Sequence, residues 1–242
     1  MLSFFKKRYS FKEIPLLVDI HSHLLPQIDD GSSSMEETLE LLACFQNLGF
    51  KKVITTPHIQ DLYPNTKKSI VSKLKEVKEI LETTDLEIRI EAAAEYYFDE
   101  SLPGLISDKE NLLTFGDDYV LFETPFLNEP FNLKELIFEM FSSGLKPVLA
   151  HPERYSYLQS NFKLAQDLWE RGLLFQLNVA SLSGLYSPLV SRFAKKLIGN
   201  KMVSFLGSDC HNLIHFEHYK KSLDKKFFHK ALDLPLLNQS LL

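Results

Sequence analysis

Histidine and carboxylate residues recur in short motifs along this chain of 242 residues. Five of its eight histidines stand in four of them, which read Asp19-Ile-His21-Ser-His23, Thr56-Pro-His58, His151-Pro-Glu-Arg154 and Ser208-Asp209-Cys-His211. Further carboxylates come from Asp29-Asp30-Gly31, Glu91-Ala-Ala-Ala-Glu95 and Glu123-Thr-Pro. Imidazole nitrogens and carboxylate oxygens together suit Mn, Fe, Zn or Mg better than a thiolate set would. These residues therefore predict a site for two or three divalent metal ions.

The elements that must position these residues follow from the hydrophobic pattern. Short β-branched or aromatic runs alternate with amphipathic stretches, which predicts strands that alternate with helices. We expect strands at 16–20, 52–56, 87–93, 119–123, 147–150, 174–179 and 203–207, and helices at 35–48, 67–83, 133–143, 157–171 and 188–199. This order predicts a parallel α/β architecture. The absence of a Gly-rich phosphate motif after the first strand disfavours a dinucleotide-binding fold.

The polar motifs stand at the C-terminal ends of the expected strands. Six of the seven strands finish in His, Asp or Glu, and a closed (β/α) barrel would bring those ends to one mouth. His21 and His23 alternate along a strand, so both rings point the same way. A single histidine at such a place is more often a surface or hydrogen-bonded residue. A cluster of five would repel unless cations held it, which favours the metal interpretation.

Bulk composition limits the alternatives. The length and the 45% hydrophobic content predict one domain over 1–242, with an N-terminal extension at 1–15 and a C-terminal tail at 225–242. A net charge of −5 disfavours a nucleic-acid partner. No stretch approaches the ~20 apolar residues that a membrane-spanning helix needs, so we do not expect this chain to be an integral membrane protein. The two distant cysteines, Cys44 and Cys210, indicate a reducing, cytoplasmic setting.

The ordered motifs resemble those of the PHP (polymerase and histidinol phosphatase) family. More narrowly they are similar to the bacterial CpsB/YwqE type of protein-tyrosine phosphatase from capsule and exopolysaccharide loci. The matching segments are DIHSHLLPQIDDGSSSMEETLELL, ITTPHI, AAAEYYF, LFETP, LAHPERY and LGSDCHN, which run from residue 19 to 212. The resemblance implies a distorted (β/α)7 TIM-like barrel with a trinuclear metal centre at the C-terminal ends of its strands.

The resemblance also implies which residues hold the metals. His21, His23, Glu95 and Asp209 would ligate the first ion. Glu95 would bridge to a second ion, bound also by Glu123 and His151. The third would be held by Asp30, His58 and His211. Mn is the expected metal, and Fe, Zn and Mg stay open because one ligand set accepts several divalent ions.

The implied activity is hydrolysis of phosphotyrosine on a protein by attack of a metal-bridging hydroxide. The partner would be a bacterial tyrosine kinase that controls polysaccharide export, and the oligomeric state is left open. The thiol-based alternative is disfavoured because neither cysteine begins a Cys-x5-Arg motif. Two other functions stay open: a small-molecule phosphatase of the histidinol-phosphatase type, and a non-catalytic metal-binding regulatory module.

Arg154 would contact phosphate, and His211 or a metal-bound water could assist the leaving group. Relatives of this type tend to have a second phosphate-contacting arginine shortly after the last motif. This chain has none there, so phosphate binding falls to Arg154 alone, or with His215 or His218. Asp19 and Asp29 would orient imidazoles or cap turns. Tyr97 and its aromatic neighbours would line a phosphotyrosine slot or pack in the core.

Overall fold

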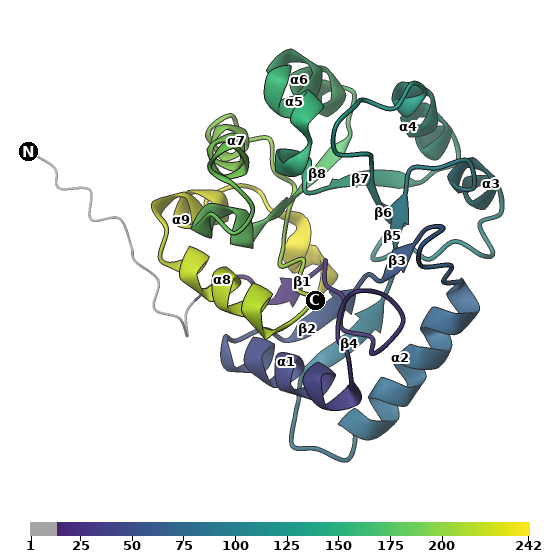
Figure 1. The fold of residues 1–242 in the computed structure, drawn as a ribbon, viewed down its shortest axis with the longest axis vertical. Coiled ribbons are helices and arrows are strands. Elements are labelled where there is room, and N and C mark those ends of the chain that lie inside the picture. The colour runs from purple at the N-terminus through teal and green to yellow at the C-terminus, as the bar shows by residue number, and fades with distance from the viewer. Residues whose placement is uncertain (1–13) are drawn as a thin grey trace, which may run out of the picture.

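The computed structural model describes residues 14–242, and these form an α/β fold in which every strand pairing is parallel (Figure 1). One sheet has three strands in the order β1-β2-β4, and the other has six in the order β3-β5-β6-β7-β8-β9. The strands are β1 (Val18–Asp19), β2 (Lys52–Thr55), β3 (His58–Ile59), β4 (Arg89–Ala92), β5 (Glu95–Tyr97), β6 (Tyr119–Glu123), β7 (Lys146–Ala150), β8 (Leu174–Asn178) and β9 (Phe205–Gly207). The predicted parallel α/β architecture is confirmed.

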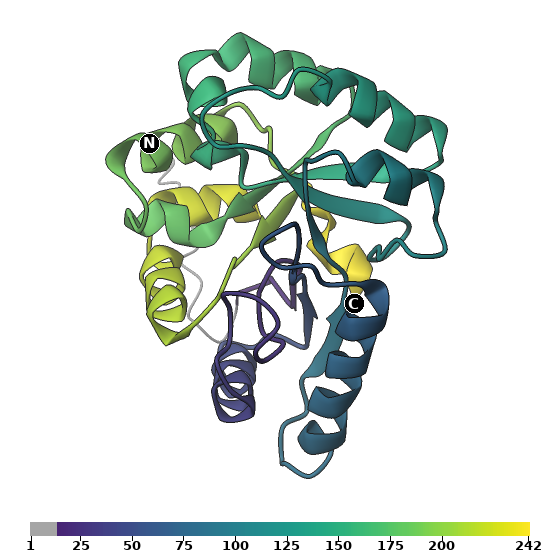
Figure 2. The same cartoon turned by 45° about the vertical axis from the view of Figure 1, so that its right-hand side comes forward.

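The helices lie around the outside of the strands, as Figures 1 and 2 show from two directions. They are α1 (Met35–Asn47), α2 (Lys67–Leu81), α3 (Leu102–Ser107), α4 (Leu133–Ser142), α5 (Ser156–Ser160), α6 (Phe162–Glu170), α7 (Pro188–Gly199), α8 (Leu213–Leu223) and α9 (Lys226–Leu232). The residues at the two ends of α1 show how the local sequence sets the bounds of a helix. Ser34 accepts a hydrogen bond from the N–H of Glu37 at the start, and Gly49 adopts a φ of 98° after the last turn.

Two of the expected strands, which the structure shows as β2 and β4, are each followed by a second short strand that was not predicted. Pro57 separates β2 from β3, since proline has no N–H to donate to a ladder, and Ala93 and Ala94 separate β4 from β5. Backbone hydrogen bonds still join the two runs across these breaks, from the N–H of Glu95 to the carbonyl of Pro57 at 3.1 Å, for example. The chain therefore passes twice from the three-stranded sheet to the six-stranded sheet, from β2 to β3 and from β4 to β5. In the larger sheet His58 of β3 pairs with Glu95 of β5.

The segments that follow the first and last strands lie side by side. The N–H of Asp209 donates to the carbonyl of His21 at 2.7 Å, and the N–H of His23 donates to the carbonyl of Cys210 at 2.9 Å. These bonds bring together two motifs that are almost 190 residues apart in the sequence. The fold thus positions the first His pair beside the last Asp and His.

The predicted helices need corrections. The single helix expected at 157–171 is wrong, because Asn161 leaves the helical conformation and caps α6 by accepting from the N–H of Leu164. Helices α3, α8 and α9 were not predicted. Helix α8 starts after Asn212, which accepts from the N–H of His215, and it buries Phe216 and Tyr219. Its first two turns carry two histidines, His215 and His218, among the apolar residues, which hid the helical period.

Chain-terminal residues also contribute to the structure. Residues 225–242 include α9 and the 3-10 helix η4 (Leu237–Leu241). Within η4, the buried Asn238 side chain donates to the carbonyl of Val18 at 3.0 Å and accepts from the N–H of Leu206 at 3.0 Å, so it joins β1 to β9. The extension predicted at 1–15 lies almost wholly outside the described residues. Among the residues that the structure describes, no helix is long and apolar enough to cross a membrane.

Candidate metal centre

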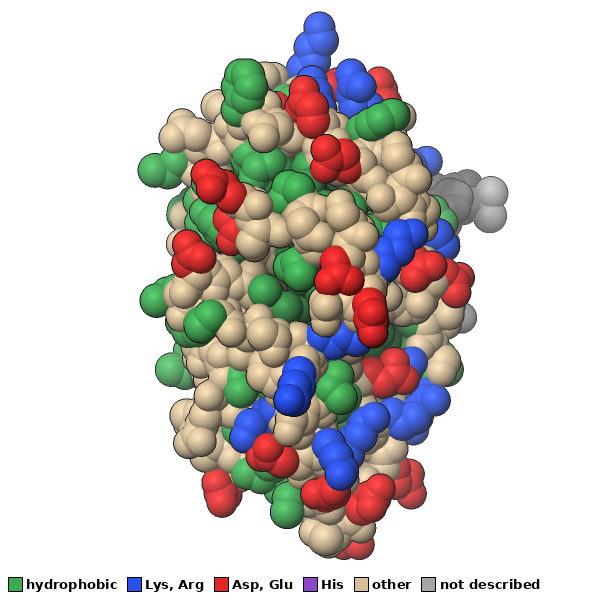
Figure 3. Space-filling view, turned by 90° about the vertical axis from the view of Figure 1, so that its right-hand side faces the viewer, with side chains coloured by type: hydrophobic (Ala, Val, Ile, Leu, Met, Phe, Trp, Pro, Cys, Tyr) green, Lys and Arg blue, Asp and Glu red, His purple; other side chains and the backbone are tan. Residues whose placement is uncertain are grey.

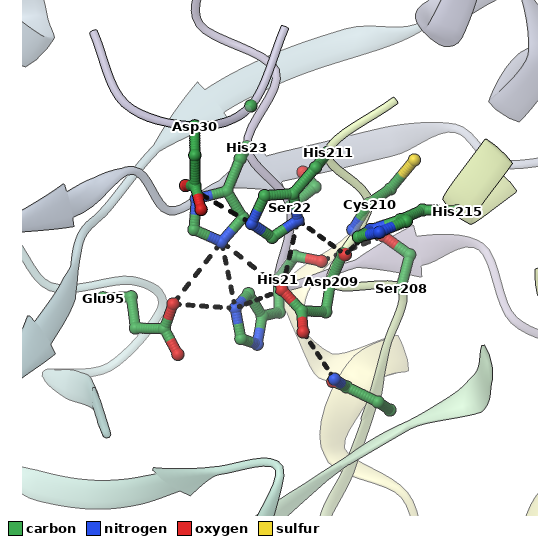
Figure 4. A network of polar contacts seen from close by, with 12 residues as sticks. His21, Ser22, His23, Asp30, Glu95, Ser208, Asp209, Cys210, His211 and His215 are labelled. Atoms are coloured by element: carbon green, nitrogen blue, oxygen red, sulfur yellow. Dashed lines mark hydrogen bonds and ion pairs between the residues drawn. The ribbon is translucent and has the colours of Figure 1, made fainter. Parts of the chain in front are cut away.

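All nine residues expected to bind metal come together at the C-terminal ends of the strands. Four groups of side chains each bring their ligand atoms within 4.8 Å of one another, and together they include every predicted ligand. The groups are His23–Asp30–His58–His211, His21–His23–Glu95, His21–His151–Asp209 and His58–Glu95–Glu123. Figure 4 shows His21, His23, Glu95, Asp209 and His211 pointing toward one another. The shared pocket that the sequence predicted is present.

Glu95, the first residue of β5, lies at the middle of this cluster. Its Oε2 is 3.2 Å from His21 Nε2, 3.4 Å from His23 Nε2 and 3.3 Å from His58 Nδ1. Its other oxygen, Oε1, is 3.0 Å from His151 Nε2. The side chain is fully buried. One carboxylate therefore contacts four imidazoles, as a bridging ligand between ions would.

The other carboxylates surround Glu95. Asp209 Oδ1 lies 3.4 Å from His21 Nε2 and 3.5 Å from His23 Nε2. Asp30 Oδ1 lies 3.5 Å from the Nε2 atoms of both His58 and His211. Glu123 approaches His58 Nδ1 at 3.3 Å and His151 Nε2 at 3.8 Å. Asp30 is the most exposed of the nine, with a side chain 49% open to solvent, and His211 is the next with 13%.

Hydrogen bonds from outside the cluster hold the imidazoles. His21 Nδ1 donates to Gln176 Oε1 at 2.7 Å, and His23 Nδ1 donates to Asp29 Oδ2 at 2.8 Å. His211 Nδ1 donates to the carbonyl of Asp209 at 3.0 Å. With Nδ1 as the donor in each ring, Nε2 is the nitrogen that faces the carboxylates and would face a bound ion. Such outer partners fix the tautomer of a metal-binding histidine.

This donor set fits divalent cations. The Nε2 atoms of His21 and His23 are only 3.4 Å apart and both face Glu95, so two ligand nitrogens and a carboxylate converge in a buried space. Glu95 Oε2, His58 Nδ1 and His151 Nδ1 are buried without a hydrogen-bond partner in the described structure. Buried polar atoms are rarely left so, and cations would satisfy them.

The electrostatics of the bare cluster point the same way. Burial lowers the pKa of His21, but the charges of Glu95 and Asp209 outweigh it and raise that pKa to about 9. For His151, burial and the nearby Arg154 lower the pKa to about 4. The bare cluster therefore retains protons on some imidazoles, and bound ions would displace those protons.

Asp29 and Asp19 have different roles. Asp29 contacts His23 and also accepts from the N–H of His58 at 3.1 Å, as expected of a residue that orients imidazoles. Asp19 instead accepts from the N–H and the hydroxyl of Ser208, both at 2.8 Å, and makes no hydrogen bond to an imidazole among the described residues. Of the two roles expected for Asp19, the orientation of an imidazole is therefore not seen among the described residues, and the carboxylate instead fixes the start of the last motif.

The sequence did not reveal the contribution of β8, whose polar residues are amides rather than ionisable groups. Gln176 Nε2 donates to Asn178 Oδ1 at 2.9 Å, and Asn178 Nδ2 donates to Asp209 Oδ2 at 2.6 Å. These two residues link His21 to Asp209 through one chain of hydrogen bonds. The available signal was two amides at alternate positions of an otherwise apolar run, since such positions share a face.

Gly207 allows this packing. A Cβ at that position would lie 2.6 Å from Gln176 Nε2 and 2.8 Å from the Cβ of His21, closer than real atoms approach. Backbone strain occurs nearby as well. His151 has a φ of 33° and Asp209 a φ of 51°, in the left-handed region that non-glycine residues seldom adopt. Such strain is often found at functional sites.

Arg154 stands beside the cluster, on the 3-10 helix η2 (Pro152–Arg154). Its Nη1 donates to Asp209 Oδ2 at 3.0 Å. Its guanidinium carbon lies 4.7 Å from the ring centre of Phe126 and 4.4 Å from that of Tyr186. The two rings and the carboxylate hold the guanidinium in place, with part of it open to solvent.

The cluster opens into a pocket of about 530 Å³, the catalytic pocket. Its walls include Arg154, His215 and the aromatic residues Tyr63, Tyr97 and Phe126. His218 forms a hydrogen bond with Ser183 at 3.0 Å and does not line the pocket. Of the two histidines considered for phosphate contact, His215 is therefore the one that lies at the pocket wall. Tyr96 packs in the core, which leaves Tyr97 as the pocket residue of that run.

The cysteines are not arranged for covalent catalysis. Cys210 is fully buried, donates through Sγ to the carbonyl of Asn212 at 3.4 Å, and burial raises its pKa well above the usual range. A thiol that stays protonated is a poor nucleophile. Cys44 is only half-buried against the core, and both cysteines are free.

Fold and site together define an α/β protein with a candidate metal centre of histidines and carboxylates. The chain belongs to the family described as capsular polysaccharide synthesis, CpsB/CapC, whose sequence model matches residues 17–227. The resemblance that the motifs indicated is therefore confirmed.

Individual relatives agree with this membership. The chain is 29% identical to the CapC protein of Staphylococcus aureus over 93% of this chain and 90% of that protein. It is 27% identical to the tyrosine-protein phosphatase YwqE of Bacillus subtilis, over 87% of this chain and 85% of that one. A solved chain from structures of YwqE and of Streptococcus pneumoniae CpsB, described as metal-dependent tyrosine phosphatases, superposes with a TM-score of 0.79 at 27% identity and covers 87% of both chains.

Proposed function

We propose that this protein is a metal-dependent phosphomonoester hydrolase that removes phosphate from phosphotyrosine in proteins. The observation that supports this most directly is the buried Glu95 in contact with four imidazoles, beside Arg154 at the bottom of an aromatic-walled pocket. The similarity to YwqE and CpsB, which are described as metal-dependent tyrosine phosphatases, supports the same activity.

We propose three metal positions for the nine residues. His21, His23, Glu95 and Asp209 would hold the first ion; Glu95, Glu123 and His151 the second; and Asp30, His58 and His211 the third. The groups His21–His23–Glu95 and His23–Asp30–His58–His211 support the first and third positions. The second position is supported by His151 Nε2, which lies 3.0 Å from Glu95 Oε1 and 3.8 Å from Glu123 Oε2. Mn is the ion we propose, because a mixed nitrogen and oxygen set suits it, although Fe, Zn and Mg use the same ligands.

Divalent ions bound there would supply positive charge toward the phosphate and a water of lowered pKa as nucleophile. The protein's own groups do the rest. Arg154 can donate to two phosphate oxygens at once, because its planar fork matches their spacing. Tyr97 and Phe126 can pack against the phenyl ring. The phenolate leaves with little protonation, so we favour a ligand role for His211, whose Nε2 already faces Asp30.

Three broader features belong to the same proposal. The two sheets would form a distorted (β/α)7 barrel, supported by the hydrogen bonds that join the segments after β1 and β9. The natural substrate would be a bacterial tyrosine kinase linked to polysaccharide export, and the family description, capsular polysaccharide synthesis, supports the link to polysaccharide. A cytoplasmic location would agree with two free cysteines.

The test compares three substrates on one preparation. Phosphate release is measured from a phosphotyrosine peptide, from histidinol phosphate and from a DNA oligonucleotide, before chelation, after chelation and after Mn is restored. We expect turnover of the peptide to exceed that of the other two, to stop on chelation and to return with Mn. Preference for histidinol phosphate would replace this function with the small-molecule alternative. Metal binding without turnover of any phosphate ester would support the regulatory module.

A further inference from the structure

A second hollow of about 590 Å³ lies next to the catalytic pocket, between the β5–α3 loop, the β6–α4 loop and helix α4. Apolar side chains, including Phe98, Pro125 and Leu136, form part of its wall. Its carboxylates are Asp99, Glu100, Glu135 and Glu139. We call this hollow the acidic groove. Figure 3 views this side of the molecule and shows acidic side chains around apolar ones on its upper half.

The negative charge of the acidic groove is not neutralised within the protein. Glu100, Glu135 and Glu139 are exposed, and none of the four carboxylates takes part in an ion pair of the described residues. The nearest lysine in sequence on α4, Lys134, is paired with Asp167 instead at 2.9 Å. The groove therefore presents four carboxylates to whatever enters it.

Large apolar side chains border the same groove. In the β6–α4 loop, Leu127 is 73% exposed and Phe131 is fully exposed. Apolar side chains of that size at the surface, next to a hollow, are typical of interaction sites rather than of bare surface. The combination selects for a partner that is both apolar and positively charged.

The acidic groove adjoins the catalytic pocket at two places along the chain. Phe126 lines the catalytic pocket while the preceding residue, Pro125, lines the groove. In the same way, Tyr97 lines the catalytic pocket and the next residue, Phe98, lines the groove. An extended peptide advances about 3.3 Å per residue, so a segment only a few residues from a bound phosphotyrosine would reach the groove.

We propose that the acidic groove binds the segment that flanks phosphotyrosine in the protein substrate, and that it selects a lysine or arginine beside an apolar residue. This inference rests on the proposed function, because it takes the catalytic pocket to hold the phosphotyrosine. Four unpaired carboxylates attract a cationic side chain and repel anionic partners such as acidic lipid or nucleic acid. A small phosphate ester fills only the catalytic pocket and is indifferent to the groove.

The test uses two phosphotyrosine peptides of equal length, one with lysines and one with glutamates two to four residues from the phosphotyrosine. We expect the metal-loaded protein to favour the lysine peptide about tenfold in kcat/KM, and to lose that preference in 0.5 M NaCl as screening increases. The double variant Glu135→Lys, Glu139→Lys should abolish the preference. Its hydrolysis of p-nitrophenyl phosphate should stay within about twofold, since both residues are exposed on α4.

The matched control is Glu82→Lys with Glu170→Lys, which changes two exposed, unpaired carboxylates elsewhere by the same charge. This control should keep the lysine preference. Equal loss in both double variants, or no preference in the unmodified protein, would overturn the inference and leave the hydrolase intact. A groove variant that altered the sedimentation of the protein would assign this face to a second copy of the chain. Failure to hydrolyse any phosphotyrosine ester would remove the proposed function, and the inference with it.

Discussion

The catalytic pocket and the acidic groove are neighbours of similar size, about 530 and 590 Å³, and carboxylates line both. They differ in what surrounds those carboxylates. Glu95 and Asp209 are buried among imidazoles, whereas Glu135 and Glu139 face solvent without an ionic partner. Buried charge must be compensated, and compensation by nitrogen ligands and cations creates reactivity. Exposed charge is solvated, and it acts only by attracting cationic partners and repelling anionic ones. Residue type alone does not distinguish a reactive site from a docking surface.

The largest expected effect comes from removing the central charge of the catalytic pocket. Glu95→Gln keeps the shape but removes the charge of the carboxylate that we propose as a bridging ligand, so we expect hydrolysis to fall by about 10³-fold or more and at least one metal ion to be lost. Steady-state kinetics and elemental analysis of the metal content would measure both. Glu135→Gln in the groove is the matched change and should leave p-nitrophenyl phosphate turnover within about twofold.

Cys210→Ser provides a second comparison for the same experiment. Because this thiol is buried and protonated, most activity should remain. An inactive Cys210→Ser variant together with an active Glu95→Gln variant would refute the metal-based mechanism and indicate a thiol nucleophile.

Arg154 separates phosphate recognition from metal binding within the catalytic pocket. Arg154→Ala should reduce kcat/KM by about 10²-fold, because a bidentate contact to phosphate is lost, while the metal content stays the same. Arg154→Lys should recover only part of this loss, since an ammonium cannot reproduce the fork. Loss of metal in either variant would show instead that the Arg154–Asp209 ion pair holds the centre together.

Glu153 tests the cost of burying a carboxyl group next to the pocket. Burial raises its pKa to about 7, although Ser181 and the N–H of Asn178 donate to it. The folded protein keeps a proton that the unfolded chain releases, so this residue makes stability fall as the pH rises from about 4.5 to about 7. Glu153→Gln should remove that fall. The free energy of unfolding of the variant, relative to that of the unmodified protein, should therefore be about 2 kcal/mol higher at pH 8 than at pH 5.

Chemical denaturation at the two pH values would measure the effect of Glu153→Gln. The Asp19 carboxyl, whose pKa burial also raises to about 7, is present in both proteins and cancels in the comparison. An equal difference in stability at both pH values would mean that Glu153 does not change its protonation in this range.

The smallest expected effect lies one shell outside the metal ligands. Gln176→Met keeps the length of the side chain but removes the acceptor for His21 Nδ1, so we expect metal affinity to fall about tenfold. Metal titration would measure this, and activity at saturating metal should largely return. Unchanged affinity would show that the packing around Gly207, rather than the hydrogen bond, orients the His21 ring.

The sequence by itself determined the parallel α/β architecture and the polar motifs at the ends of its strands, and the resemblance to the family selected the nine candidate ligands among those motifs. Both are encoded locally: buried strands are apolar along their length, and the C-terminal ends of parallel strands lie at one edge, so residues such as His58, Glu123 and His151 could be placed from their position alone. Motif order also sufficed to indicate the CpsB/CapC family, which the comparison confirmed.

Only the tertiary structure decided how those residues divide their contacts. The central place of Glu95, the amide chain through Gln176 and Asn178, and the bond of Asp19 to Ser208 all join residues far apart in the sequence. Neutral amides carry no signature of a metal site, and a carboxylate next to a histidine in sequence can point elsewhere in space. The acidic groove was equally hidden, because it exists only where two loops and α4 meet.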